Sequence, residues 1–179
     1  MVDITDEIGD DTTIDAAFRA AVAAHGERPF LAIPANEARG YLASGFEISY
    51  GKAGQRVAAL AAIYRAAGYG LGHRVATLLE NRPDYVLHKL ALNSLGTAVV
   101  PINPDYRAGE IAYLLDHSEP DLVLALETRA AHLGEALVTS AHRPPMVVLS
   151  EFGGRLARPA RRSASGALLP ETPASILYT

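Results

Sequence analysis

The residues that could bind a nucleotide phosphate are the glycines of the segment GYGLG: Gly68, Gly70 and Gly72. A phosphate-binding glycine loop follows a strand and opens a helix, because the N–H groups of the helix N-terminus point at the anion. Here the glycines follow a helical pattern and precede a strand pattern, which is the reverse order. We therefore interpret this segment as a helix stop followed by a tight turn.

The other chemically capable side chains do not form a recognisable catalytic or metal site. No two histidines have a spacing such as i and i+4, which would place two imidazoles on one helix face. Asp116 and Glu119 end a helical pattern, where we expect contact with solvent and not with a substrate. The absence of cysteine excludes disulfides, thiolate catalysis and cysteine-ligated metals. We assign no catalytic residue and no metal ligand. The histidines are His25, His73, His88, His117, His132 and His142.

The segment PINPDY, residues 101–106, is the stretch best placed to meet a ligand. It ends an apolar run typical of a buried parallel strand, so it should lie at the carboxyl edge of a sheet, where open α/β folds bind ligands. Its two prolines make a rigid exit from the strand. From these residues alone we favour a strand-to-helix connector over a ligand contact.

Composition and charge exclude several classes of protein. The chain has 179 residues, 49% of them hydrophobic and 20% charged, which is typical of one globular domain. Its formal net charge of −4 argues against a nucleic-acid partner. The N-terminus is acidic where a signal peptide needs a basic region, and no stretch approaches the roughly 20 apolar residues of a membrane span. We predict a cytoplasmic protein without a transmembrane segment.

One basic cluster stands out against this acidic balance. It consists of Arg155, Arg158, Arg161 and Arg162, and Pro159 interrupts it. Because it lies in a stretch that contains glycine and serine, we predict a solvated loop and not a patch that binds phosphate or membrane.

Alternating helical and strand patterns must position these residues. After an acidic leader, residues 1–12, which we expect to be flexible, helices are predicted over 13–26, 50–68, 81–96, 106–119 and 129–140. Strands are predicted over 28–33, 45–50, 73–79, 97–103, 121–126, 144–150 and, after an irregular stretch, over the final ASILYT, residues 174–179. The first two strands suit a hairpin. The others predict an α/β fold: a layered, mostly parallel sheet with helices on both faces.

The helix ends carry signals of their own. Thr12 or Thr13 can cap the first helix, Gly68 suits the end of the second, and Pro83 suits the first turn of the third, which Gly96 should stop.

From about Thr13 onward the chain resembles the N-terminal part of the adenylate-forming, AMP-binding acyl-CoA ligases. The matching motifs are Ser49-Tyr50 at the start of an Ala- and Leu-rich helix, GLGHRVA (70–76), NRPDY (81–85), VVPINP (99–104) and EIAYLL (110–115). The segment LALNSLGTAVVPINPDYR, residues 90–107, particularly resembles the sequences of the branch that includes carnitine/crotonobetaine-type and medium- or long-chain acyl-CoA ligases. The resemblance implies that the fold is the N-terminal part of the large domain of such a ligase.

Two positions depart from the family pattern. Lys52 stands where the family usually has an acidic residue that completes a capping box, so we expect a weaker helix start there. His73 stands where aspartate is common. Neither position carries the family's chemistry.

The resemblance gives the end of the sequence a specific meaning. In the family, a strand similar to ILYT leads directly into a loop of the type S-G-T-T-G-x-P-K-G, which surrounds the phosphates of ATP. Thr179 aligns with the first residue of that loop and is the one cofactor-binding residue that we assign. The resemblance places the adenine, ribose and magnesium contacts and a C-terminal lysine beyond it. We therefore expect residues 13–179 to be an incomplete AMP-binding domain, truncated before the phosphate loop.

The resemblance also implies a function for the complete enzyme. It would use ATP and Mg²⁺ to convert a small-molecule carboxylate, such as a fatty acid, into an acyl-adenylate, and would then transfer the acyl group to CoA. We expect the 179-residue chain alone to be inactive, and to self-associate through an exposed sheet edge. The alternatives are a non-catalytic α/β module, a relic, half of a split enzyme completed by a separate C-terminal fragment, and a small ligand-binding domain of flavodoxin type.

Overall fold

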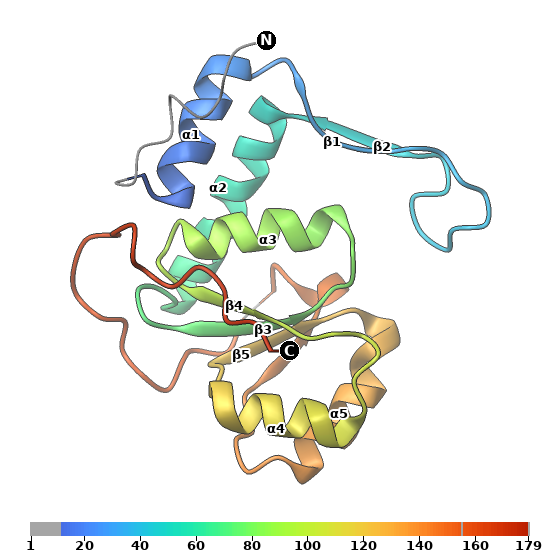
Figure 1. Ribbon diagram of the computed structural model, residues 1–179, viewed down its shortest axis with the longest axis vertical. Coiled ribbons are helices and arrows are strands. Elements are labelled where there is room, and N and C mark those ends of the chain that lie inside the picture. The colour runs from blue at the N-terminus through green and yellow to red at the C-terminus, as the bar shows by residue number, and fades with distance from the viewer. Residues whose placement is uncertain (1–11, 155, 179) are drawn as a thin grey trace.

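The computed structural model describes residues 12–154 and 156–178 (Figure 1). The helices there are α1 (Ile14–His25), α2 (Tyr50–Ala67), α3 (Pro83–Asn93), α4 (Ala108–Ser118) and α5 (Ala130–Thr139), with short 3-10 helices η2 (Glu127–Arg129) and η3 (Leu149–Glu151). The strands are β1 (Pro29–Ile33), β2 (Phe46–Ser49), β3 (Arg74–Leu78), β4 (Ala98–Pro101), β5 (Leu122–Ala125) and β6 (Met146–Val148). The acidic leader falls largely outside the described residues.

A four-stranded parallel sheet forms the centre of the molecule, with strand order β4-β3-β5-β6. Helices α2 and α3 lie on one face of it, and α4 and α5 lie on the other (Figure 1). Successive side chains of β5 alternate between the two helical layers, so the whole strand is buried. This explains the continuous apolar run of its sequence and confirms the predicted layered, parallel α/β architecture.

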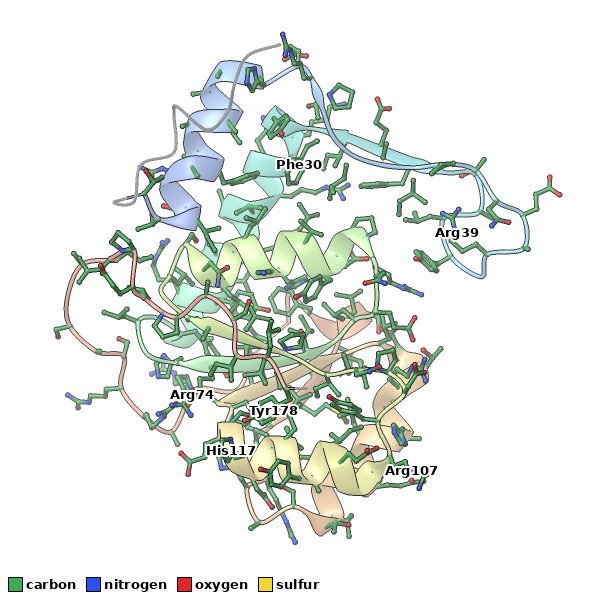
Figure 2. All side chains as sticks on the ribbon, in the orientation of Figure 1. Phe30, Arg39, Arg74, Arg107, His117 and Tyr178 are labelled. Carbon is green, nitrogen blue, oxygen red and sulfur yellow. The ribbon has the colours of Figure 1, made fainter. Side chains whose placement is uncertain are left out.

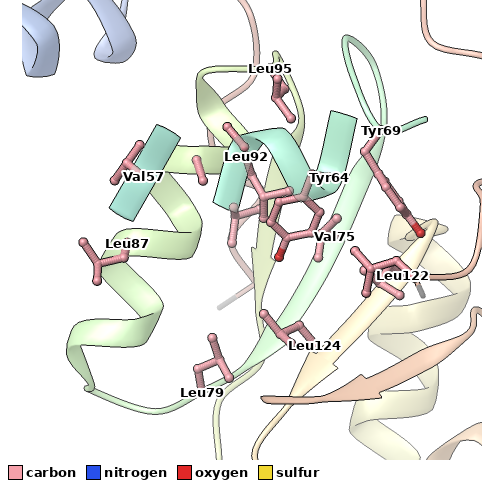
Figure 3. Packing of buried hydrophobic residues seen from close by; sticks show 14 of the residues in the cluster. Val57, Tyr64, Tyr69, Val75, Leu79, Leu87, Leu92, Leu95, Leu122 and Leu124 are labelled. Atoms are coloured by element: carbon pink, nitrogen blue, oxygen red, sulfur yellow. The ribbon is translucent and has the colours of Figure 1, made fainter. Parts of the chain in front are cut away.

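The two layers form separate cores. Between the sheet and α2 and α3, the core is built around Tyr64, Leu92 and Leu124 (Figure 3). On the other face, Ile111 and Leu115 of α4 pack with Leu133 of α5 against the sheet.

The first core contains one buried polar pair. The hydroxyl of Tyr64 lies 2.9 Å from Nδ1 of His88, and the ring of Phe152 packs edge-on against the imidazole, with centroids 4.6 Å apart. Burial lowers the pKa of His88 to about 4, because the apolar surroundings disfavour the charged imidazolium. His88 is therefore a hydrogen-bonded core residue.

Most of the predicted helix ends are confirmed. The hydroxyl of Thr13 accepts a hydrogen bond from the N–H of Ala16, and Gly68 ends α2 in the left-handed conformation at φ 101°. Pro83 occupies the first turn of α3. The helical residues of α3 end at Asn93, and Gly96 closes the helix as predicted: its N–H donates to the carbonyl of Asn93, and the N–H of Thr97 donates to the carbonyl of Leu92, both at 3.0 Å. Gly96 is left-handed, at φ 71°, and leads into β4.

An arm projects from the body. It is the antiparallel hairpin of β1 and β2, as the two strand patterns predicted, with its connecting loop at the far end (Figure 1). Tyr41 in this loop donates a hydrogen bond to the carbonyl of Asn81 at 3.1 Å, which ties the loop back to the body.

In the described residues, no helix combines the length and the apolar character that crossing a membrane requires.

Candidate functional site

The carboxyl edge of the sheet is where the parallel strands end together. The connectors that leave this edge are residues 79–82 after β3, 102–107 after β4 and the segment that begins at Leu126 after β5. In open α/β folds, ligands bind at this edge, near the point where the strand order reverses direction. Here β4 lies on one side of β3, and the chain then crosses back so that β5 lies on the other side of β3. The strand order therefore reverses direction between β3 and β5.

The last described residues reach the same edge alongside β4. The N–H of Val99 donates to the carbonyl of Ala174 at 3.1 Å, and the N–H of Ile176 donates to the carbonyl of Val99 at 2.9 Å. These two bonds form a single parallel bridge between Val99 and Ser175. The side-chain amide of Asn93 supports it, since Nδ2 donates to the carbonyl of Ala174 at 2.8 Å.

The predicted strand over residues 174–179 is therefore wrong in extent, because one bridge takes its place. The next bond of a parallel ladder would run from the N–H of residue 101 to the carbonyl of Ile176. Residue 101 is proline and has no N–H, so the ladder cannot continue there. Leu177, which follows, is 71% exposed.

Tyr178 lies against α4 and the connector that precedes it (Figure 2). Its carbonyl accepts a hydrogen bond from the hydroxyl of Tyr106 at 3.2 Å, and its hydroxyl lies 2.8 Å from Nδ1 of His117. The ring of Tyr113 stacks on the ring of His117. A shallow hollow adjoins this cluster, lined by Tyr106, Gly109, Glu110, Tyr113, Leu114 and Tyr178.

Thr179, the cofactor-binding residue assigned from the sequence, lies outside the described residues. Its neighbour Tyr178 contacts Tyr106 on the carboxyl side of β4. The connector PINPDY contributes Tyr106 to this contact. Within the connector, Asn103 accepts a hydrogen bond from the N–H of Asp105 at 3.0 Å, which is a local turn bond.

Four charged residues lie together at the reversal point, and the sequence analysis did not predict this cluster. Glu80 and Arg82 follow β3, and Glu127 and Arg129 occupy the equivalent places after β5. Nη2 of Arg129 lies 2.6 Å from Oε1 of Glu80 and forms an ion pair across the two connectors. A repeated pattern in the sequence could have indicated the cluster, because both strands are followed by Leu-Glu-x-Arg. The sequence does not show, however, that the two strands are neighbours in the sheet.

The remaining two members of this cluster bind other loops. The guanidinium of Arg82 lies over the ring of Tyr41, 3.9 Å from its centroid. Glu127 accepts a hydrogen bond from the N–H of Ser150 at 2.6 Å. Its carboxyl pKa is lowered by the bonds to Ser150, with a smaller contribution from the charge of Arg82. The cluster thus links the connectors after β3 and β5 to the arm and to η3.

Asp116, one of the two carboxylates considered in the sequence, has a local structural role. It accepts hydrogen bonds from the hydroxyl of Ser140 at 2.6 Å and from the N–H of His142 at 2.9 Å. The bond from His142 is the main cause that lowers the pKa of this exposed carboxyl group. Asp116 therefore fixes the turn after α5.

The bonds at this edge position the chain segment that ends at Tyr178. Within residues 12–154 and 156–178, no group of three or more His, Asp or Glu side chains could hold a metal ion. GYGLG forms the helix stop and turn expected from its sequence, with Gly68 and Gly72 both at positive φ.

Comparison with known sequences places nearly the whole chain in one family. The profile described as "AMP-binding enzyme" matches residues 18–179. The sulfoacetate–CoA ligase of Cupriavidus necator is 28% identical over 171 residues, which cover 93% of this chain and 32% of that protein. The long-chain-fatty-acid–CoA ligase of Thermus thermophilus is 36% identical over 89 residues, covering 50% of this chain and 16% of that protein.

Peptide synthetases also match. The dimodular nonribosomal peptide synthase of Bacillus subtilis is 28% identical over 133 residues, covering 74% of this chain and 6% of that protein. The chain thus spans at most about a third of the length of these three relatives.

Solved structures share the fold. The fatty acyl CoA synthetase of Mycobacterium tuberculosis matches 93% of this chain with a TM-score of 0.74 and 21% identity, and 32% of that chain is covered. A long-chain-fatty-acid-CoA ligase from Archaeoglobus fulgidus matches 94% of this chain with the same TM-score and identity, and 34% of that chain is covered.

Proposed function

The chain belongs to the AMP-binding enzyme family, and we propose that it is the N-terminal segment of an ATP-dependent acyl-CoA ligase. The complete enzyme would convert a carboxylate into an acyl-adenylate with release of pyrophosphate, and would then form a thioester with CoA. One observation carries the proposal beyond the family match. The bridge between Val99 and Ser175 directs the main chain toward the carboxyl edge just before position 179, where the family resemblance expects the phosphate loop to begin.

The chemistry explains why this placement matters. Transfer of an adenylyl group requires that negative charge on the phosphates be offset and that the carboxylate be held in line with the α-phosphorus. A loop rich in small and hydroxyl residues at the carboxyl edge supplies N–H groups for this purpose. This segment would supply the scaffold for such a loop, with Thr179 as its first residue.

The described residues do not by themselves fit ATP or Mg²⁺. The polar atoms around Tyr178 bond to one another, and no carboxylate cluster in the described parts could hold the metal. ATP, CoA and Mg²⁺ are cofactors of the proposed complete enzyme, and we propose that residues 1–179 alone neither bind them well nor catalyse adenylation.

The substrate class is proposed at the level of a carboxylate. Two relatives are named for different carboxylates, one for sulfoacetate and the other for long-chain fatty acids. The branch suggested by residues 90–107 stays a prediction.

A chimeric enzyme tests the proposal. Residues 1–179 would replace the matching N-terminal segment of the Cupriavidus necator sulfoacetate–CoA ligase, which aligns with 93% of this chain. We expect the chimera to catalyse carboxylate-dependent exchange of pyrophosphate into ATP, and the 179-residue chain alone to show none.

Two controls make the result decisive. Circular dichroism and a cooperative thermal transition would establish that the chimera is folded. A folded chimera without exchange activity would contradict the ligase assignment, whereas exchange by the 179-residue chain alone would contradict its proposed inactivity.

A further inference from the structure

A long exposed segment joins the buried core to the final bridge. We call residues 156–173 the strap. It starts at Leu156, which is buried, and leads to Ala174, which bonds to β4 (Figure 1). Between residues 157 and 171, only Pro159 and Leu168 are even partly buried. Apolar burial therefore contributes little to the position of the strap, and its few polar bonds must decide it.

The strongest of these bonds is an ion pair at the amino edge of the sheet. Arg161 of the strap contacts Asp121, which immediately precedes β5, through two parallel bonds: Nε to Oδ1 at 3.0 Å and Nη2 to Oδ2 at 2.7 Å. The side chain of Asp121 is only 5% exposed, and it also accepts a bond from the N–H of Arg74 at 2.9 Å. The two-pronged geometry fixes direction as well as distance, so it holds the strap more specifically than a single contact would.

The ionisation state of Asp121 is consistent with its ion pair to Arg161. Burial alone would raise its carboxyl pKa, but the bonds from Arg161 and from the N–H of Arg74 outweigh burial, and the pKa is lowered. Asp121 therefore stays ionised and paired at neutral pH.

His73 holds the same point of the strap from the other side. Its ring is 1% exposed, and Nδ1 accepts a hydrogen bond from the N–H of Gly70 at 3.0 Å. Nε2 must then carry the proton of the neutral ring, and it donates to the carbonyl of Arg161 at 3.0 Å. Arg161 is thus held at both its main chain and its side chain.

Two further bonds lie on either side of this residue. The hydroxyl of Tyr69 donates to the carbonyl of Ala157 at 3.0 Å, and the N–H of Ala164 donates to the carbonyl of Leu71 at 2.8 Å. From residue 165 to residue 173 the described strap has only its own local turn bonds between Leu169 and Thr172.

We propose that Arg161, Asp121 and His73 form a latch that positions the strap, and through it residues 174–178 beside β4. This rests on the proposed function in one respect: in the complete ligase, the latch would set the position from which the phosphate loop begins. Arg161 is then a positioning residue, which acts at one edge of the sheet on a segment that emerges at the opposite edge.

Hydrogen exchange on the 179-residue chain tests the latch without reference to activity. The readout is the N–H of Ile176, which bonds to Val99. With Arg161→Ala, we expect this amide to exchange about tenfold faster or more, while the amides of β3 and β5 keep their rates, because a local opening does not require global unfolding. Arg161→Lys keeps the charge but not the paired geometry, so we expect partial rescue.

Arg162→Ala is the matched control, since Arg162 is an exposed neighbour in the strap. It should leave the exchange of Ile176 unchanged. An unchanged rate in Arg161→Ala would overturn the latch, and so would an equal acceleration in Arg162→Ala or throughout the sheet.

The chimeric enzyme separates this inference from the proposed function. If the chimera is active, Arg161→Ala should raise its KM for ATP and leave its KM for the carboxylate unchanged. If exchange at Ile176 responds to Arg161→Ala but the chimera is inactive, the latch stands and the ligase assignment fails. If the chimera is active but Arg161→Ala leaves its KM for ATP unchanged, the latch does not position the phosphate loop.

Discussion

At the scale of single residues, two histidines have structural roles that their isolated positions in the sequence did not suggest. His88 bonds to Tyr64 inside the core, and His73 holds the strap. His73 occupies the position at which the sequence comparison with the ligase family led us to expect aspartate. Here its two nitrogens connect the turn at Gly70 to Arg161, a contact that requires one donor and one acceptor.

The basic cluster shows how much a single residue can differ from its neighbours. Arg155 lies outside the described residues, and Arg158 and Arg162 are exposed, as expected of a solvated loop. Arg161 is exposed too, but unlike these two neighbours it also binds the buried carboxylate of Asp121, which the sequence did not indicate.

His88 gives a pH-dependent prediction. Its pKa is about 4 when the chain is folded and about 6.5 when it is unfolded, so protonation favours the unfolded state. The contribution of His88 is fully present above pH 6.5 and is lost as the pH falls toward 4, at a cost of up to about 3 kcal/mol. Urea unfolding at pH 7.5, 5.5 and 4.5 measures it.

The variant His88→Gln provides the comparison, because glutamine can hydrogen-bond but does not titrate in this range. We expect it to be less stable at pH 7.5 and to show a shallower loss of stability between pH 6.5 and 4. Parallel pH profiles for the two proteins would show that His88 is not the responsible group.

At the scale of elements, one proline decides where the last segment stops pairing. The sequence ILYT has the apolar and aromatic character of a strand, but its partner β4 ends in Pro101. A strand needs donors on its neighbour, so its own residues cannot guarantee its length.

Substitution of this proline gives a direct test. In Pro101→Ala, the new N–H would face the carbonyl of Ile176, and we expect it to be protected from hydrogen exchange as the ladder gains a bond. Protection of the Ile176 amide should rise as well. A fully exposed rate for the amide of residue 101 would contradict this account of why the bridge is so short.

The two connectors with Glu-x-Arg show a different kind of element pairing. Glu80 reaches Arg129 only because β3 and β5 are neighbours in the sheet, although α3, β4 and α4 separate them in the chain. Glu80 also has a positive φ of 57°, which is uncommon for a residue other than glycine. The residue that forms the ion pair is therefore also the residue with the unusual backbone conformation at the carboxyl edge.

At the scale of the whole molecule, the exposed edge of the sheet predicts self-association. Among the described residues, β4 is one of the two outer strands of the sheet, and on its outer side it pairs only through the bridge at Val99. Leu177 beside this edge is 71% exposed. Open edges and exposed apolar side chains favour contacts between copies of a chain.

Sedimentation velocity of the 179-residue chain over a range of concentrations measures this property. We expect concentration-dependent association, and we expect Leu177→Lys to reduce it. Val138→Lys is the matched control, because Val138 is 74% exposed on α5, away from this edge. A chain that stays monomeric, or an equal effect of both lysines, would contradict association through the edge.

The sequence by itself determined the local elements and the fold class. Helical periodicity, caps such as Thr13 and Gly68, and apolar runs such as that of β5 depend on residues close together in the chain, so their physics is visible in the sequence. The ordered motifs also pointed to the family that the comparisons then established.

Only the tertiary structure decided which distant residues meet. The order β4-β3-β5-β6 brings Glu80 to Arg129, and the path of the strap brings Arg161 to Asp121 and His73. No local pattern encodes these pairings, because each depends on which strands become neighbours and on where a long connection crosses the sheet. For the same reason, Pro101 could be recognised as the stop of the final segment only once β4 was known to be its partner.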